Sequence, residues 1–151
     1  MLREEKESVL SRRALWVGLA VSWLLMGAFL AKLSAEPAQG SLIGRWLAED
    51  ILGGGVIDRL QSVLEIAADG TVSGSGGCNR MRGHATIDGE KLSFGPLITT
   101  RMACSPAVMD QEGKFLASLE KVRSFRIDNA QRKLILFDDA GNRILVLAAL
   151  S

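Results

Sequence analysis

The residues best suited to covalent chemistry or metal binding are two cysteines and one histidine, Cys78, Cys104 and His84. Such residues could form a disulfide, a thiol nucleophile activated by a base, or part of a metal site. A structural zinc site takes four protein ligands, which these three side chains cannot supply. We therefore expect no metal site and no cofactor.

Nucleophilic catalysis by a cysteine is also disfavoured by the spacing. His84 lies six residues after Cys78, which corresponds to about 20 Å in an extended strand. Only a tight turn could bring the two side chains together. We expect no catalytic residue, and a cysteine enzyme is kept as a third alternative that requires an accessible thiol.

The first cysteine lies in a glycine-rich stretch, GSGGCNRMRG, over residues 74–83. Glycines at this density permit positive φ and close backbone approach, as at a bulge or a tight crossing. The stretch could also cradle an anion. It lacks the Lys-Ser/Thr ending of a nucleotide-binding P-loop, so nucleotide binding is not expected.

Glu112 is a carboxylate in an apolar setting. It lies between Val108 and Leu119 on the apolar face of an expected helix, where a carboxylate must be paired or keep its proton. We expect Arg80 or Arg101 to pair with it as a structural anchor, with an exposed Glu112 or a catalytic acid as alternatives. Arg82 completes a small basic group, for which contact with an anionic lipid or the cell wall is the other interpretation.

These residues must be positioned by a mainly β domain. Short alternating runs are separated by turn signals at Asp69-Gly70, Asp88-Gly89 and Ala140-Gly141. The pattern predicts seven or eight strands in an antiparallel meander, curled into a barrel-like sheet. Ser105-Pro106 predicts the start of a helix over residues 106–121, packed across the sheet.

The N-terminal segment predicts export. Residues 14–31 hold 18 residues without a charge, enough for a helix of about 27 Å at 1.5 Å per residue. Arg12 and Arg13 precede this run, so the remainder should face outward. Residues 1–35 are thus a signal peptide or an uncleaved anchor in the inner membrane, exported by the general or the twin-arginine route, and residues 36–43 are a linker.

Composition agrees with a small exported domain. The chain has 151 residues with 18 Lys+Arg and 17 Asp+Glu, a balance that excludes a broadly basic nucleic-acid binder and an acidic disordered tail. We expect no nucleic-acid partner. An even number of cysteines in an oxidising compartment favours one disulfide, with free thiols as the alternative.

Taken in order, these motifs make residues 44–148 resemble the META domain, also called HslJ-like. The match rests on a first strand Gly-Arg-Trp-Leu, the Gly-Cys-Asn-Arg element, the Thr-Thr-Arg-Met-Ala-Cys element and the helix after it. The residues that carry it are Trp46, Gly77, Cys78, Asn79, Arg80, Gly83, Thr100, Met102, Cys104 and Glu112.

The resemblance implies an α+β, mostly β fold: a cracked-barrel-like antiparallel sheet with one packed helix, here over residues 44–151 and preceded by an N-terminal apolar helix. It also implies a periplasmic or cell-envelope protein, because members of the family are found in bacterial envelope proteins and some secreted proteins. Bacterial members are associated with heat shock and novobiocin tolerance. No established catalytic activity defines the family. Many relatives carry a lipoprotein signal ending in cysteine, which this apolar run lacks, so lipid attachment is not expected.

Two functions follow as expectations. The first is a non-enzymatic envelope domain that supports protein or membrane integrity under stress, with an unidentified envelope protein as partner. The second is a binding module, in which the partly open barrel takes an apolar ligand or a partner's peptide.

Overall fold

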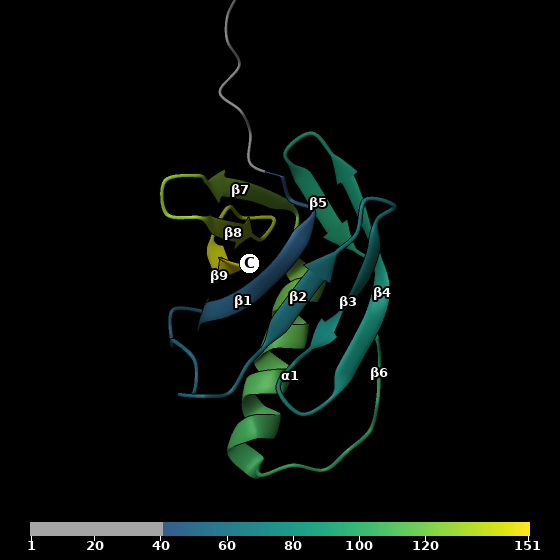
Figure 1. Cartoon of the computed structure of the whole chain (residues 1–151), viewed down its shortest axis with the longest axis vertical. Helices are drawn as coiled ribbons and strands as arrows, with labels where there is room; N and C mark the ends of the chain where they lie inside the picture. Colours follow the sequence, from purple (N-terminus) through teal and green to yellow (C-terminus); the bar gives the residue numbers. More distant parts are fainter. Residues whose placement is uncertain (1–40) are drawn as a thin grey trace, which may run out of the picture. The chain divides into compact units, whose positions relative to one another are not determined.

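The computed structural model describes residues 41–151, which hold nine strands and one helix (Figure 1). The elements are β1 (Gly44–Ile51), β2 (Val63–Ile66), β3 (Thr71–Ser75), β4 (Arg80–Asp88), β5 (Lys91–Phe94), β6 (Ile98–Thr99), α1 (Pro106–Lys121), β7 (Ser124–Asp128), β8 (Lys133–Phe137) and β9 (Arg143–Leu150). The antiparallel, mostly β fold with one helix is confirmed. The expected apolar helix at 14–31 lies outside the described residues.

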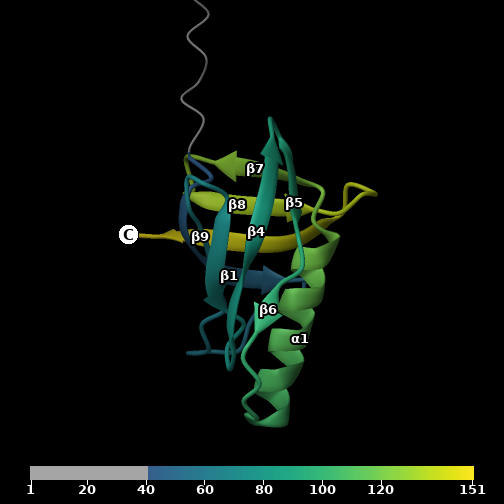
Figure 2. The ribbon, with the colours of Figure 1, turned by 90° about the vertical axis from the view of Figure 1, so that its right-hand side faces the viewer.

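The strands form one sheet that returns on itself. Their order is β3-β2-β1-β9-β8-β7-β5-β4-β6, and β3 also pairs with β4, so eight strands close into a ring and β6 is added at the edge of β4 (Figures 1 and 2). The expectation of a meander with seven or eight strands was therefore incomplete. The first strand, β1, pairs with the last strand, β9. In the sequence, α1 lies between β6 and β7.

The ring is joined unevenly. β1 and β9 share a long register from Arg45↔Leu150 to Ile51↔Leu145. In contrast, β5 and β7 are joined at the single register pair Lys91↔Ser124. This narrow seam between β5 and β7 has the fewest register pairs in the ring.

The predicted turns form for local reasons. Gly70 has φ +82°, a left-handed conformation that glycine adopts without a steric cost. The carboxylate of Asp69 accepts a hydrogen bond from the backbone N–H of Thr71 at 2.8 Å. Gly89 and Gly141 have φ of 59° and 79° in the corresponding turns, so these hairpin signals are confirmed.

Alternate strand residues fill the ring with aliphatic side chains. The most deeply buried of these strand residues are Leu64, Ile66, Val72, Met81, Leu92, Leu134, Leu136, Leu145 and Leu147. α1 packs against β1, β5 and β9, and its Phe115 and Leu119 are fully buried. The helix bounds match the expected 106–121, although the hydroxyl of Ser105 makes no capping hydrogen bond.

The folded part begins before the expected domain start at residue 44. Leu42 is 7% exposed and belongs to the core. Its carbonyl accepts a hydrogen bond from the indole Nε1 of Trp46 at 2.9 Å. Across residues 41–151, α1 does not reach the length and hydropathy that a membrane-crossing helix needs, and no other helix is present there.

Candidate functional site

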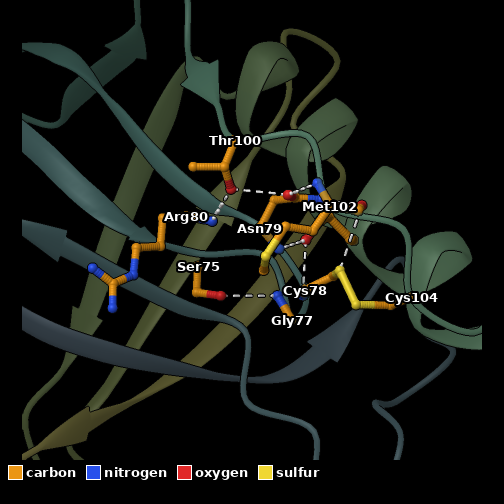
Figure 3. Close-up of a disulfide and its surroundings, with 9 residues drawn as sticks. Ser75, Gly77, Cys78, Asn79, Arg80, Thr100, Met102 and Cys104 are labelled. Atoms are coloured by element: carbon orange, nitrogen blue, oxygen red, sulfur yellow. Dashed lines mark hydrogen bonds between the residues drawn. A yellow bond between two sulfur atoms is a disulfide. The ribbon is translucent and has the colours of Figure 1, made fainter.

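Three segments from two distant parts of the sequence meet beside a disulfide (Figure 3). They are the loop of residues 76–79 between β3 and β4, the segment of residues 100–104 before α1, and the first half of α1. The disulfide joins Cys78 to Cys104, with 6.1 Å between their Cα atoms and a sequence separation of 26. The cysteine pair favoured by the sequence is thus bonded, and it ties the β3–β4 loop to the start of the helix.

Glu112 anchors α1 to this loop. Its Oε2 accepts hydrogen bonds from the backbone N–H of Cys78 at 2.9 Å and of Asn79 at 2.6 Å. Its Oε1 accepts a third from Nδ2 of Asn79 at 2.7 Å. The side chain is 4% exposed. Burial on its own would raise the pKa of Glu112, but the three hydrogen bonds outweigh it and lower the pKa below its usual value.

The arginines do not pair with Glu112, so that expectation was wrong. Within residues 41–151, neither Arg80 nor Arg101 has an ion pair with it. Two backbone amides and one side-chain amide satisfy the carboxylate instead. Arg80 lies on the exposed face of β4, and Figure 3 shows its side chain extending away from Asn79. The buried position of Glu112 itself, derived from helical spacing, is confirmed.

Asn79 uses every hydrogen bond that its amide can make. Its Oδ1 accepts from the backbone N–H of Met102 at 2.7 Å and from the hydroxyl of Thr100 at 2.9 Å. Its Nδ2 donates to Glu112 and, at 3.2 Å, to the carbonyl of Met102. The motif residues Asn79, Thr100, Met102 and Glu112 therefore form one connected cluster, which we call the Asn79–Glu112 network.

The glycines of the motif allow close backbone approach, to this network at Gly76 and to the neighbouring Leu97 at Gly83. A Cβ atom on Gly76 would lie 2.5 Å from Cγ of Glu112, and one on Gly83 would lie 2.6 Å from Cδ2 of Leu97. Gly77 has φ +135°, which L side chains rarely adopt. Trp46 is part of the core on β1, with its indole bonded to Leu42, and it is not a member of the network.

A second polar chain beside the network was not predicted. The hydroxyl of Ser62 donates to the carbonyl of Gly76 at 2.6 Å and accepts from Nε2 of Gln111 at 3.1 Å. Oε1 of Gln111 accepts from the backbone N–H of Ile57 at 2.7 Å. The one signal that could have found Gln111 is its position four residues before the buried Phe115, on the same helix face.

The side chains of this site are bonded to one another and to the backbone. Both sulfurs are in the disulfide, so neither offers a thiolate. Every buried side-chain nitrogen and oxygen in residues 41–151 has a hydrogen-bond partner. His84 is exposed on β4, opposite Thr71 of β3. Across the same residues, no three His, Cys, Asp or Glu side chains gather closely enough to hold a metal ion.

A shallow surface groove of about 420 Å³ lies along α1, outside the ring. Its apolar part includes Leu52, which is 54% exposed, and Met109, which is 36% exposed. Leu52 has φ 56°, an uncommon conformation for a leucine. The residues that line the groove are Leu52, Met109, Asp110, Gly113, Lys114, Ala117, Ser118 and Lys121.

Known proteins share this fold and these motifs. A protein from Burkholderia xenovorans with an NMR structure superposes with a TM-score of 0.61 and 26% identity, covering 72% of this chain and 82% of that one. A second NMR structure gives a TM-score of 0.53 at 22% identity, covering 70% and 88%. A search of curated proteins found no significant match. The model of the META domain matches residues 40–150. The chain belongs to the META domain family.

Proposed function

We propose that this chain is an exported, non-enzymatic protein of the cell envelope, whose domain supports protein or membrane integrity under stress such as heat or novobiocin. The observation that carries the proposal is that the motif residues are bonded within the domain itself. Cys78 is bonded to Cys104, and the polar groups of the Asn79–Glu112 network form hydrogen bonds within the domain. Residues that are bonded in this way favour a structural role over catalysis.

Export is supported by two independent features. A disulfide between Cys78 and Cys104 persists in an oxidising compartment and is rare in the cytosol. The uncharged run at 14–31, preceded by Arg12 and Arg13, has the charge asymmetry of a segment that directs the following domain outward. The domain is then periplasmic, either released by cleavage or held at the inner membrane by one helix.

Thiol trapping in the producing cells tests the compartment. Cells are quenched in acid and treated with a maleimide of high mass, and the full chain is compared with and without prior reduction. We expect Cys78 and Cys104 to react only after reduction, and the protein to fractionate with the envelope. Reactive thiols on a cytosolic protein would refute the proposal.

Genetic complementation tests the stress role. A strain lacking the protein should grow less well at raised temperature or with novobiocin, and the wild-type chain should restore growth. A Glu112→Ala variant should restore it poorly because the network is broken, whereas the exposed control Glu120→Ala should restore it fully. Normal growth of the deletion strain under both stresses would contradict the stress role.

A second candidate function is a binding module, and the groove along α1 favours it. The groove combines the exposed Leu52 and Met109 with the cationic Lys121, a combination suited to an amphiphile with an anionic head or to a partner's peptide. Lys114 also lines the groove, where it is paired with Asp110 at 2.7 Å. Its position differs from the expected ligand site inside the ring, where the core side chains are packed.

Thermal unfolding with laurate as the probe tests this second function. Ligand binding should raise the melting temperature as the laurate concentration rises. A Met109→Glu variant should lose that response, whereas Ile87→Glu, which changes an exposed aliphatic residue outside the groove, should keep it. A laurate response that is equal in both variants would place binding elsewhere.

A further inference from the structure

The exposed face of β4 carries two neighbouring arginines. Arg80 and Arg82 alternate with Met81, which is 1% exposed and points into the core. Across the ladder to β3, Arg80 faces Ser75 and Arg82 faces Ser73. Both neighbours are uncharged, so β3 provides no counter-charge for either arginine.

On its other side, β4 pairs with β6, and further exposed residues follow β6 in the chain. Ile98 is in register with Arg82 and is 77% exposed. Arg101 is exposed, and Met102 beside it is 56% exposed. We call Arg80, Arg82, Ile98, Arg101 and Met102 the β4–β6 surface. Exposed aliphatic side chains next to cations are typical of surfaces that enter the headgroup region of a bilayer.

The cations of the β4–β6 surface are not neutralised within the described part of the chain. The ion pairs found in residues 41–151 involve Arg45, Lys114 and Lys133. Arg80, Arg82 and Arg101 take part in none of them. Three unpaired guanidinium groups call for an anionic partner, and guanidinium binds phosphate oxygens with paired hydrogen bonds.

We propose that the β4–β6 surface docks on the anionic phospholipid headgroups of the membrane to which the chain is attached. Arg80, Arg82 and Arg101 would contact lipid phosphates, and Ile98 and Met102 would enter the interface. None of the five residues is aromatic, so the surface lacks the stacking side chains that single-stranded nucleic acids require. The proposal rests on the proposed export, with the run at 14–31 kept in the bilayer.

Attachment of the chain to the membrane allows a weak contact between the β4–β6 surface and the bilayer to be populated. Each basic residue near an anionic surface strengthens docking on the order of fivefold, so three arginines alone bind weakly from solution. The sequence between residues 31 and 41 spans at most about 35 Å when extended. A tether of that length holds the domain at a high effective concentration beside the bilayer, where a weak contact becomes populated.

Hydrogen exchange on the full chain in vesicles tests the proposal. The chain is reconstituted into phosphatidylcholine vesicles and into vesicles that also contain phosphatidylglycerol, and floated protein is analysed. We expect slower amide exchange over residues 80–84 and 97–102 in the anionic vesicles only. High salt should abolish the difference, because at ~1 M the screening length falls to about 3 Å.

Variants show whether the arginines cause this protection. Arg80→Thr should weaken docking about fivefold, and Arg80→Thr with Arg82→Thr about 25-fold. Replacing both by lysine should keep docking, because the positive charges remain. Arg143→Thr is the matched control: it removes the same charge from β9, four strands away around the ring, and should leave exchange at β4 and β6 unchanged.

Several outcomes would overturn the proposal. These are equal exchange in neutral and anionic vesicles, an equal effect of Arg143→Thr, or a chain that floats with neither vesicle. Protection by heparin without protection by vesicles would also overturn it and assign the surface to an anionic polysaccharide. Failure of the proposed export would instead be seen in the thiol-trapping experiment, as reduced cysteines in the cytosol.

Discussion

At the scale of single residues, Glu112 holds α1 and the β3–β4 loop together through one carboxylate. Its two oxygens accept three hydrogen bonds, two from backbone amides and one from Asn79. Removing a buried acceptor leaves each of its donors without a partner, so the loss of stability exceeds the contribution of any single hydrogen bond. The stability of the whole cluster should therefore depend on this side chain.

Replacing Glu112 with alanine should destabilise the domain strongly. The backbone N–H groups of Cys78 and Asn79 would be left buried without their acceptor, which costs about 3 kcal/mol. Urea unfolding followed by circular dichroism measures the change. The control Glu120→Ala, on the exposed face of the same helix, should change the free energy of unfolding by less than about 0.5 kcal/mol. Equal effects of the two variants would contradict the anchoring role.

The pH dependence of stability should carry the signature of Glu112. Its pKa in the folded protein is lowered below the ordinary value of 4.5, so the ionised form stabilises the fold. That contribution is complete above the unfolded pKa and is lost as pH falls through the lower folded pKa.

We expect the difference in unfolding free energy between wild type and Glu112→Gln to be constant near neutrality and to shrink as the pH falls below about 4.5. The pKa values of Asp69 and Asp138 are also lowered, but both residues are present in each variant, so their contributions cancel in the difference. A pH-independent difference would show that the charge of Glu112 is not what stabilises the fold.

At the scale of elements, two glycines with opposite surroundings form a matched pair. A Cβ on Gly76 would collide with Cγ of Glu112, whose carboxylate is held in place, whereas a Cβ on Gly113 would meet nothing within 4 Å. Gly76→Ala should therefore destabilise the domain by about 1–3 kcal/mol. Gly113→Ala should stabilise it by about 0.5–1 kcal/mol, because alanine favours the helix. Thermal unfolding of both variants checks the opposite signs.

Elements governed by local rules were predictable from the sequence. The helix bounds follow from Ser105-Pro106 and the spacing of Phe115 and Leu119, and two of the turns follow from Asp-Gly pairs. The pairing of β1 with β9 was not predictable, because no local signal specifies a contact between the two ends of a domain. The two-residue β6 is likewise too short to give an alternating pattern.

The site divides in the same way. Helical periodicity placed Glu112 on the buried face, and the motif resemblance grouped it with Asn79, Thr100 and Met102. Charge alone suggested arginine partners, but the loop amides of Cys78 and Asn79 take that role. Backbone donors have no signature in the sequence, because every residue except proline carries one.

At the scale of the whole molecule, the ring should open first at its narrow seam. β5 and β7 share one register pair, supported by the backbone hydrogen bonds from Leu92 to Arg123 and from Phe125 to Glu90. Native-state hydrogen exchange should find the amides of Leu92 and Phe125 exchanging on the order of tenfold faster than the bonded amides of the β1–β9 pair. Uniform protection around the ring would indicate that it opens only as a unit.

The disulfide affects the folding equilibrium of the whole domain by restricting the unfolded chain. It closes a loop with a sequence separation of 26, and in the chain-entropy model a loop of that size stabilises the native state by about 3.5 kcal/mol. Reduction should lower the free energy of unfolding by this amount, provided the reduced chain still folds. The slope against urea should increase, because an unfolded chain without the cross-link is less compact and exposes more surface.

The double variant Cys78→Ala with Cys104→Ala separates this effect from the chemistry of the sulfurs. No hydrogen bond of the Asn79–Glu112 network uses a cysteine sulfur, so the network should survive in the variant, and Glu112→Ala should cost about 3 kcal/mol there as well. A much smaller cost in the variant would mean that the disulfide sets the geometry of the network. The two devices would then be one coupled clamp between α1 and the β3–β4 loop, and losing either would release the other.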